Sequence, residues 1–320
     1  MKPNRPSPVY SALKALCILL GIVLTAMLCA TAYFHHLFSQ VNYVPEDSVT
    51  SLVHDAVEAF LPNEAASISQ TSDDSINILL IGQDSRGGSD AARSDSMILC
   101  TFHKGSNTLT MTSFLRDLYL PIPGHGSNRI NAAYSYGGMS LLKKTLEDNF
   151  LLDIDGCVEV DFSQFAEIID LLGGVTLELR QDEADIINRE TGSTLTQGRQ
   201  LLTGSQALTY SRIRKLDRDG DFSRTGRQRK VMGALLEAYK TSSIPTMLLL
   251  LDEILPLITT DLKTGRILTL ALEVFPHMSG LQVTSRCIPA EGTYTDQTID
   301  GMSVLVADLE AARSLLHADS

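Results

Sequence analysis

An uncharged, strongly apolar run close to the N-terminus constrains this chain more than any other feature. The run extends from Ala15 to Phe34 and reads ALCILLGIVLTAMLCATAYF. About twenty helical residues, each adding about 1.5 Å, span the roughly 30 Å hydrocarbon layer of a bilayer. We therefore expect a transmembrane helix over residues 15–38, with the remainder of the chain divided between the two sides of a membrane.

The charges that flank this run predict its orientation. Lys2, Arg5 and Lys14 precede it, whereas two histidines and an acidic, polar stretch follow it. The positive-inside rule then places residues 1–14 in the cytoplasm and the C-terminal part outside the cell, as a single-pass membrane protein. Residues 39–75 are rich in Ser, Asp, Glu and Ala and are expected to form an extracellular linker. The alternative is a cleaved signal peptide, but the apolar core exceeds the usual length of about 7 to 15 residues.

Composition limits what the outer part can be. A chain of 320 residues leaves room for the anchor and one large domain, which we place at residues 76–320. The formal net charge of -12 argues against a nucleic-acid-binding protein, which needs excess Lys and Arg to displace phosphate counterions. Cys100, Cys157 and Cys287 are scattered without metal-ligand spacing, and we expect them to be buried single thiols.

The outer part alternates between two kinds of apolar pattern. Short continuous apolar runs predict strands, and apolar residues at helical spacing predict helices, so we expect an α/β fold with a central sheet covered by helices. The predicted strands are 76–81, 96–102, 109–114, 156–160 and 175–179, and the predicted helices are 139–150, 162–172, 206–210, 226–240 and 245–258.

Two acidic residues follow or begin predicted strands. Asp84 lies in the segment GQDSR after the first strand, and Asp95 lies in RSDS before the second. Two carboxylates at the ends of neighbouring strands can hold Mg²⁺ together with phosphate oxygens and water. An ordinary surface loop with salt bridges is the alternative interpretation of this pattern alone.

Arginines are concentrated later in the chain. Arg116 and Asp117 follow the apolar stretch that ends at residue 115, where Arg116 could bind an oxyanion or form a structural ion pair. A denser group lies between residues 212 and 230 of this acidic protein and comprises Arg212, Arg214, Asp221, Arg224, Arg227 and Gln228. Guanidinium groups bind phosphate oxygens in pairs of hydrogen bonds, so the group could hold a pyrophosphate. A solvated basic face is the alternative.

With these residues described, the chain resembles the LytR-CpsA-Psr family over its motif core, residues 77–230. The matching segments, in the order of the family's motifs, are NILLIGQDSR, RSDSMIL, FLRD, LPIPGHGSNRINAAYSYGG, VDFSQFAEIIDLLGGV, LLTGSQALTYSRIR and GDFSRTGRQRKV. The segment SFLRDL departs from many relatives, which have a proline before the Arg and a threonine after the Asp. The departure bears on the local loop and not on Arg116.

The resemblance implies an α/β/α layered domain with a central mixed β-sheet that holds a polyprenyl phosphate in an apolar tunnel. It implies metal coordination by Asp84 and Asp95. It also implies pyrophosphate binding by Arg86, Arg93, Arg116, Arg212 and Arg214, with Asp221, Arg224, Arg227 and Gln228 around the head group. Phe162 begins an apolar segment that could supply surface for the lipid tail or simply form core.

The activity implied is transfer of a glycopolymer, such as teichoic acid or capsule, from undecaprenyl pyrophosphate to peptidoglycan, assisted by Mg²⁺. Such a reaction requires positioning and charge neutralisation more than a protein nucleophile. Asp84 or Asp117, rather than Asp221, is the expected acceptor of the hydroxyl proton. The alternatives are a non-catalytic protein that binds lipid-linked precursors and a hydrolase that acts on the same donor.

Overall fold

The computed structural model describes residues 42–44, 75–83, 94–214, 216, 220–240, 250 and 253–318. The predicted transmembrane helix and nearly all of the predicted linker lie outside these residues, as does the segment 84–93. No helix within the described part of the chain is both long and apolar enough to cross a bilayer.

The centre of the molecule is a seven-stranded sheet with the strand order β1-β10-β7-β2-β3-β4-β11. Strand β2 runs parallel to β7 and antiparallel to β3, and β4 runs antiparallel to β3 and parallel to β11. The sheet is therefore mixed, and the predicted α/β class is confirmed. Its strands are β1 (Asn42–Tyr43), β2 (Ser75–Gln83), β3 (Ser94–His103), β4 (Thr108–Phe114), β7 (Gly156–Asp161), β10 (Thr259–Thr260) and β11 (Gln282–Ile288).

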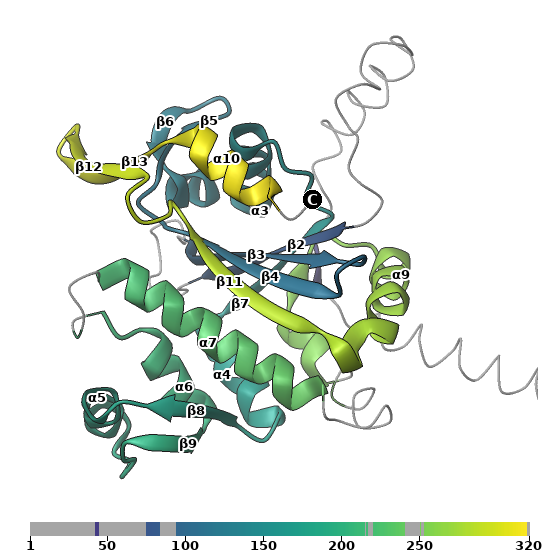
Figure 1. Cartoon of the computed structure of the whole chain (residues 1–320), viewed down its shortest axis with the longest axis vertical. Helices are drawn as coiled ribbons and strands as arrows, with labels where there is room; N and C mark the ends of the chain where they lie inside the picture. Colours follow the sequence, from purple (N-terminus) through teal and green to yellow (C-terminus); the bar gives the residue numbers. More distant parts are fainter. Residues whose placement is uncertain are drawn as a thin grey trace, which may run out of the picture.

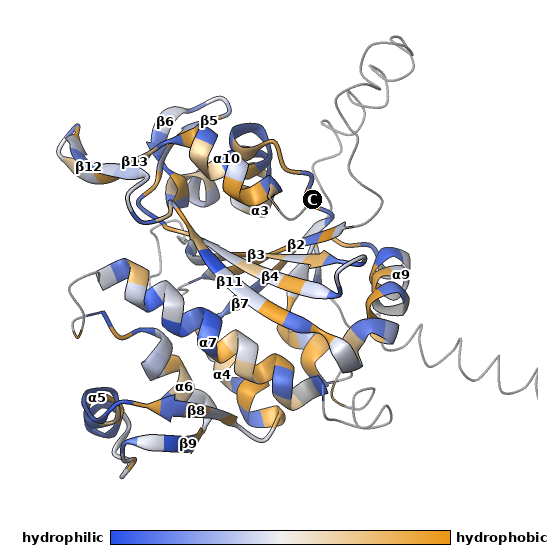
Figure 2. Ribbon diagram, viewed as in Figure 1, coloured by the Kyte–Doolittle hydropathy of each residue, from blue (hydrophilic) through white to orange (hydrophobic). Residues whose placement is uncertain are grey.

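Helices cover both faces of this sheet (Figure 1). Helices α3 (Ile130–Phe150) and α10 (Leu309–His317) lie on one face. Helices α4 (Phe162–Leu171), α6 (Gly204–Ser211) and α7 (Gly220–Lys240) lie on the other. Figure 2 shows hydrophobic residues concentrated in the strands of the sheet and in α4, which places the apolar cores between the layers.

Smaller elements surround these layers. Hairpins are formed by β5 (Tyr119–Ile122) with β6 (Gly126–Arg129), by β8 (Val175–Leu179) with β9 (Gly198–Leu202), and by β12 (Tyr294–Ile299) with β13 (Met302–Ala307). Helices α5 (Gln181–Thr191) and α9 (Thr264–Val274) and the 3-10 helices Leu255–Leu257 and Phe275–Gly280 complete the described fold. The strand predicted at 175–179 thus exists, but it pairs in a hairpin and not in the central sheet.

Local capping and a close helix contact bring α6 to the end of strand β7. Asp161, the last residue of β7, caps α4 by accepting a hydrogen bond from the N–H of Gln164 at 2.8 Å. Helix α6 packs on α4 at Gly204, where an added Cβ would lie only 1.9 Å from the carbonyl oxygen of Ala166. Only glycine permits this approach, and it holds the C-terminal end of α6 beside the start of α4.

The C-terminal segment is built into the same body. Strand β11 pairs with β4 along seven residues at the sheet edge. The hairpin β12–β13 contacts the loop that follows β4, because the N–H of Leu305 donates to the carbonyl oxygen of Asp117 at 2.9 Å. Residues far beyond the arginine-rich segment therefore support the loop that carries Arg116.

Candidate active site

A pocket of about 390 Å³ opens where β3, the loop after β4, α4, α6 and α7 meet. Its walls are mainly cationic, which is unexpected for a chain with a formal net charge of -12. The lining residues are Asp95, Arg116, Phe162, Arg212, Arg214, Arg224 and Gln228.

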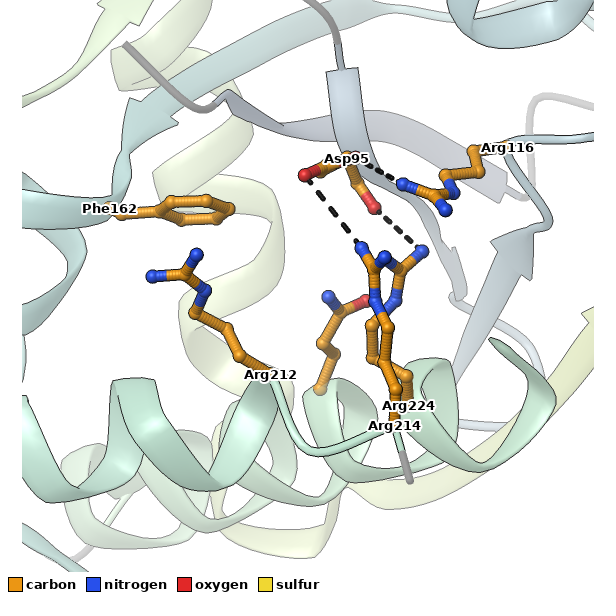
Figure 3. Close-up of a pocket in the computed structure, with 7 residues that line it drawn as sticks. Asp95, Arg116, Phe162, Arg212, Arg214 and Arg224 are labelled. Carbon is orange, nitrogen blue, oxygen red and sulfur yellow. Dashed lines mark hydrogen bonds and ion pairs between the residues drawn. The ribbon is translucent and has the colours of Figure 1, made fainter. Parts of the chain in front are cut away.

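Asp95 lies at the centre of this group, and three guanidinium groups point toward it (Figure 3). Its Oδ1 accepts a hydrogen bond from Nη1 of Arg116 at 3.0 Å. Nη2 of Arg214 lies 4.0 Å from its Oδ2, and Nη2 of Arg224 donates to its backbone carbonyl oxygen at 3.3 Å. One carboxylate thus organises cations from three separate segments of the chain.

Arg224 is the most deeply placed of the cations, with a side chain only 2% exposed. Its Nη2 donates to Oδ2 of Asp221 at 2.9 Å, within the first turns of α7. The pKa of Arg224 is lowered to about 10, mainly by burial and also by the charges of Arg214 and Arg116, against the opposing effect of Asp221. The guanidinium is therefore held in surroundings that would be stabilised by additional negative charge.

Arg116 sits among three carboxylates. Besides the bond to Asp95, its Nε lies 3.6 Å from Oδ2 of Asp117 and 3.6 Å from Oδ2 of Asp221. Burial alone would lower the pKa of Arg116, but Asp221, Asp95 and Asp117 together raise it above its ordinary value. Arg116 thus stays charged in the pocket wall.

Two buried N–H groups of the pocket lack an acceptor within the described residues. They are the Nε groups of Arg116 and Arg224. A buried donor without an acceptor costs about 1–3 kcal/mol. Oxygen-rich anions such as phosphates supply acceptors of the kind that guanidinium groups bind best.

Arg212 approaches the pocket from the opposite side. It is the C-cap residue of α6, and its guanidinium carbon lies 5.0 Å from the ring centroid of Phe162, the first residue of α4. Figure 3 shows the guanidinium spread beneath that ring. Gln228 completes the wall and accepts a hydrogen bond from the hydroxyl of Ser96 at 3.1 Å. The aromatic ring orients Arg212 without neutralising its charge.

The structure brings together most, but not all, of the residues singled out from the sequence. Asp95, Arg116, Arg212, Arg214, Arg224 and Gln228 line one pocket. Asp221 contacts two of the lining arginines, as described above. Asp84, Arg86 and Arg93 lie outside the described residues, and their predicted roles stay predictions.

Asp117 does not line the pocket, although it follows Arg116 directly in the sequence. Its Oδ1 accepts a hydrogen bond from Nη1 of Arg129 at 2.9 Å. Arg129 ends β6, directly before α3, so it adds a fifth arginine close to the group. Sequence reasoning did not select Arg129. Its place at a strand end before a helix, within the segment NRINAAY, is the signal that could have indicated it.

Arg227 does not lie where the sequence placed it. The structure buries its side chain, which is 4% exposed, in an ion pair with Glu183 of α5, with Nε 2.9 Å from Oε1. It therefore does not line the pocket with Arg224 and Gln228. Phe162, which was expected to supply surface for the lipid tail or to form core, lines the pocket.

A divalent cation has one described candidate ligand in this pocket. No group of three or more His, Cys, Asp or Glu side chains suited to a metal occurs within the described part of the chain. Asp95 offers hard carboxylate oxygens, and its Oδ2 lies beyond hydrogen-bonding distance of Arg214. That is compatible with Mg²⁺, which binds through one or two carboxylates and completes its shell with phosphate oxygens and water.

Known proteins are similar to this chain in sequence and in fold. The chain is 35% identical over 217 residues to the polyisoprenyl-teichoic acid–peptidoglycan teichoic acid transferase TagT of Bacillus subtilis, covering 65% of this chain and 66% of TagT. It is 35% identical over 259 residues to the TagU transferase of Oceanobacillus iheyensis, covering 78% of each. A structure of YwtF (TagT) with bound octaprenyl pyrophosphate lipid superposes with a TM-score of 0.60 at 27% identity, covering 77% of this chain and 90% of that one.

The family comparison agrees with these relatives and with the motifs. The model of the LytR_cpsA_psr family matches residues 42–319, which include every described element from β1 to α10. The match thus extends well beyond the motif core at residues 77–230. This chain belongs to the LytR_cpsA_psr family.

Proposed function

We propose that this chain is a membrane-anchored phosphotransferase that moves a glycopolymer from undecaprenyl pyrophosphate to peptidoglycan outside the cell. The observation that carries the proposal is the pocket, where Arg116, Arg212, Arg214 and Arg224 line one cavity together with Asp95 in an acidic protein. Relatives named for teichoic acid transfer, and a related structure with bound octaprenyl pyrophosphate, support the choice of donor.

The reaction exchanges one phosphorus–oxygen bond for another. A hydroxyl oxygen of the acceptor glycan attacks the phosphorus that carries the polymer's sugar, and the bond from that phosphorus to the bridging oxygen breaks. Polyprenyl phosphate leaves, the hydroxyl proton passes to a carboxylate or to water, and a phosphodiester joins polymer to acceptor. Negative charge develops on the bridging oxygen, so catalysis requires cations that are fixed in place beforehand.

The pocket supplies such cations from a rigid frame. Asp95 holds Arg116 and Arg214 near its two oxygens, and Phe162 orients Arg212. We assign Arg116, Arg212 and Arg214 to the two phosphates of the donor. Arg224 is nearly fully buried, so we assign it to holding Asp95 and Asp221 in place and to adding positive potential.

Mg²⁺ is part of the proposal, with Asp84 and Asp95 as its protein ligands. When bound, it would neutralise charge on the pyrophosphate oxygens. The carboxylate of Asp95 fits this role, as described above, and Asp84 lies outside the described residues. For the hydroxyl proton we retain Asp84 and Asp117 as candidates. Asp117 and Asp221 each accept a hydrogen bond from an arginine, so these contacts do not distinguish the two.

We also propose the topology predicted from the sequence, with the helix 15–38 as the anchor, the N-terminus in the cytoplasm and the catalytic domain outside. The observations are the uncharged run at 15–34 and the basic residues before it. The single substitutions Ser7→Cys and Ser193→Cys, each in a chain with its native cysteines replaced, would test this in whole cells. A thiol reagent that cannot cross the membrane should label only the Ser193→Cys protein; labelling of the Ser7→Cys protein alone would contradict the proposal.

The function is tested with the purified full-length chain, a polyprenyl-diphosphate-linked oligosaccharide, Mg²⁺ and peptidoglycan. Oligosaccharide joined covalently to peptidoglycan, with release of polyprenyl phosphate, supports the transferase. Release of soluble glycan phosphate would instead indicate the hydrolase, and donor binding without turnover would indicate a precursor-binding protein. Arg116→Met serves as the inactive variant, and Arg189→Met serves as the control, because Arg189 is 70% exposed on α5 and does not line the pocket.

A further inference from the structure

The buried ion pair between Glu183 and Arg227 lies directly behind the segment that carries Arg212 and Arg214. Both side chains are nearly inaccessible, 5% and 4% exposed, and the Nε–Oε1 distance is 2.9 Å. Burying two opposite charges rarely stabilises a fold more than apolar residues of similar size would. The placement of this pair therefore calls for another explanation.

Arg227 has a second contact that reaches the pocket segment. Its Nη1 donates to the carbonyl oxygen of Ile213 at 3.2 Å. That oxygen belongs to the peptide that joins Ile213 to Arg214. The side chain of Ile213 is itself buried, at 4% exposed, whereas Arg212 and Arg214 on either side of it are exposed toward the pocket.

Glu183 is fixed from its own side. It is the third residue of α5, and its Oε2 accepts a hydrogen bond from the backbone N–H of Arg180 at 3.0 Å in a capping arrangement. The guanidinium carbon of Arg227 also lies 6.0 Å from the ring centroid of Tyr210 in α6. Arg227 thus contacts α5 through Glu183 and α6 through Tyr210. Its guanidinium also holds the peptide between Ile213 and Arg214, within the segment that carries both pocket arginines.

We propose that Glu183 and Arg227 are positioning residues that set the direction of Arg212 and Arg214 toward a diphosphate. This inference rests on the proposed function for its ligand, and it reassigns Arg227 from the head group to the support of the segment 212–214. The segment needs such support because α6 ends at Ser211. Among the described backbone contacts, only the N–H groups of Arg212 and Ile213 continue the helical pattern, to the carbonyl oxygens of residues 209 and 210.

The decisive variant removes both charges together. Arg227→Met combined with Glu183→Leu fills similar volume and leaves no unpaired buried charge, so we expect it to fold with a melting temperature close to that of the native chain. We expect its affinity for farnesyl diphosphate to fall about 10-fold and its kcat/KM for transfer about 100-fold, with kcat falling more than KM rises, since small displacements of positioning groups have effects of this size.

The conservative variant and the control separate positioning from stability. Arg227→Lys keeps the charge, but a single ammonium cannot reproduce a fork that reaches Glu183 and Ile213 at once, so an intermediate loss is expected even if the double variant does not fold. Arg180→Met is the matched control, because Arg180 lies 3.8 Å from Oε1 of Glu183 and is 50% exposed. It should retain native kcat and native diphosphate affinity.

The same proteins distinguish failure of this inference from failure of the proposed function. If the native chain binds no diphosphate, the proposed function is wrong, and the crystal structure of the double variant still tests the positioning role. In that structure we expect the peptide between Ile213 and Arg214 to be displaced. A double variant with native stability and native turnover, or with Arg212 and Arg214 in their native positions, would overturn the inference.

Discussion

Replacing Arg212 by methionine separates the binding role of a pocket arginine from any role in stability. Arg212 follows the last residue of α6 and is exposed, and its guanidinium carbon lies 5.0 Å from the ring centroid of Phe162. A cation–π contact at an exposed site contributes about 0.5–1 kcal/mol. For a domain of this size that corresponds to a fall in melting temperature of roughly 1–4 °C.

The expected effect on ligand binding is much larger. Each charge-assisted hydrogen bond to a phosphate contributes about 1.5–3 kcal/mol, which corresponds to a loss of affinity of roughly 10- to 150-fold. Arg212→Lys should give a smaller loss, because it keeps the charge but not the planar fork. The measurement is calorimetric titration of the full-length chain with farnesyl diphosphate, alongside thermal unfolding of the same samples.

Arg189→Met is the matched control for this series, because it removes one arginine charge at a site that is 70% exposed and paired with Glu190. It should bind farnesyl diphosphate with native affinity. An affinity of Arg212→Met within about twofold of native, or an equal loss in Arg189→Met, would refute the assignment of Arg212 to the phosphates. A large fall in melting temperature of Arg212→Met would show that the side chain supports the fold instead.

Three further changes test separate parts of the account. Gly204→Ala should lower the melting temperature sharply, because its Cβ would lie 1.9 Å from the carbonyl oxygen of Ala166. The control is Gly265→Ala in α9, where nothing lies within 4 Å of the added Cβ, and it should be neutral or slightly stabilising. Equal melting temperatures of the two variants would contradict the packing of α6 on α4. Burial raises the pKa of Glu159 above its ordinary value of 4.5 in the folded state. The native chain should therefore lose stability as the pH rises from about 4.5 through that raised pKa. Glu159→Gln should flatten this part of the curve of melting temperature against pH. Parallel curves for the two proteins would exclude Glu159 as the cause. Mg²⁺ should increase the affinity of the native chain for farnesyl diphosphate and leave that of Asp95→Asn unchanged, and an identical Mg²⁺ response in both proteins would remove Asp95 from the metal site.

Segments rich in apolar residues predicted the central strands well because those strands lie between two layers of helices. The strand predicted at 76–81 lies within β2 (Ser75–Gln83), and the strand predicted at 109–114 lies within β4 (Thr108–Phe114). Strand β11 was not predicted, because it is an edge strand with the sequence QVTSRCI and several exposed residues. It offers neither a continuous apolar run nor a regular alternation, and its pairing with β4 is a tertiary effect.

The start of α3 was missed for a different reason. The sequence predicted a helix from residue 139, whereas the helix begins at Ile130 and is interrupted at Gly137 and Gly138, where Gly138 has φ of 62°. Two consecutive glycines read as a helix boundary because glycine is unfavourable inside helices. The helix on both sides of the interruption is held by packing against the sheet. Such tertiary packing cannot be predicted from the local sequence.

Most of the pocket could be predicted from chemistry, and its geometry could not. Arginines that are concentrated in an acidic chain indicate an anion site whatever the fold. Arg224, Arg227 and Gln228 were expected on one helical face. Side chains of residues 227 and 228 point in directions that differ by about 100° around a helix. The pocket lies on the side of Arg224 and Gln228, so Arg227 points elsewhere. Glu183, which forms the ion pair with Arg227, lies 44 residues away in α5. Only the packing of α5 on α6, and of α6 on α7, brings these two side chains together.

The central claim is that one pocket, lined by Asp95 and the arginines 116, 212, 214 and 224, holds the diphosphate of the donor. A crystal structure of this protein with a short polyprenyl diphosphate tests it most directly. We expect both phosphates within hydrogen-bonding distance of Arg116, Arg212 and Arg214, with the lipid directed away from that cluster. A diphosphate bound elsewhere on the protein, or within this pocket but without contact to those arginines, would contradict the account.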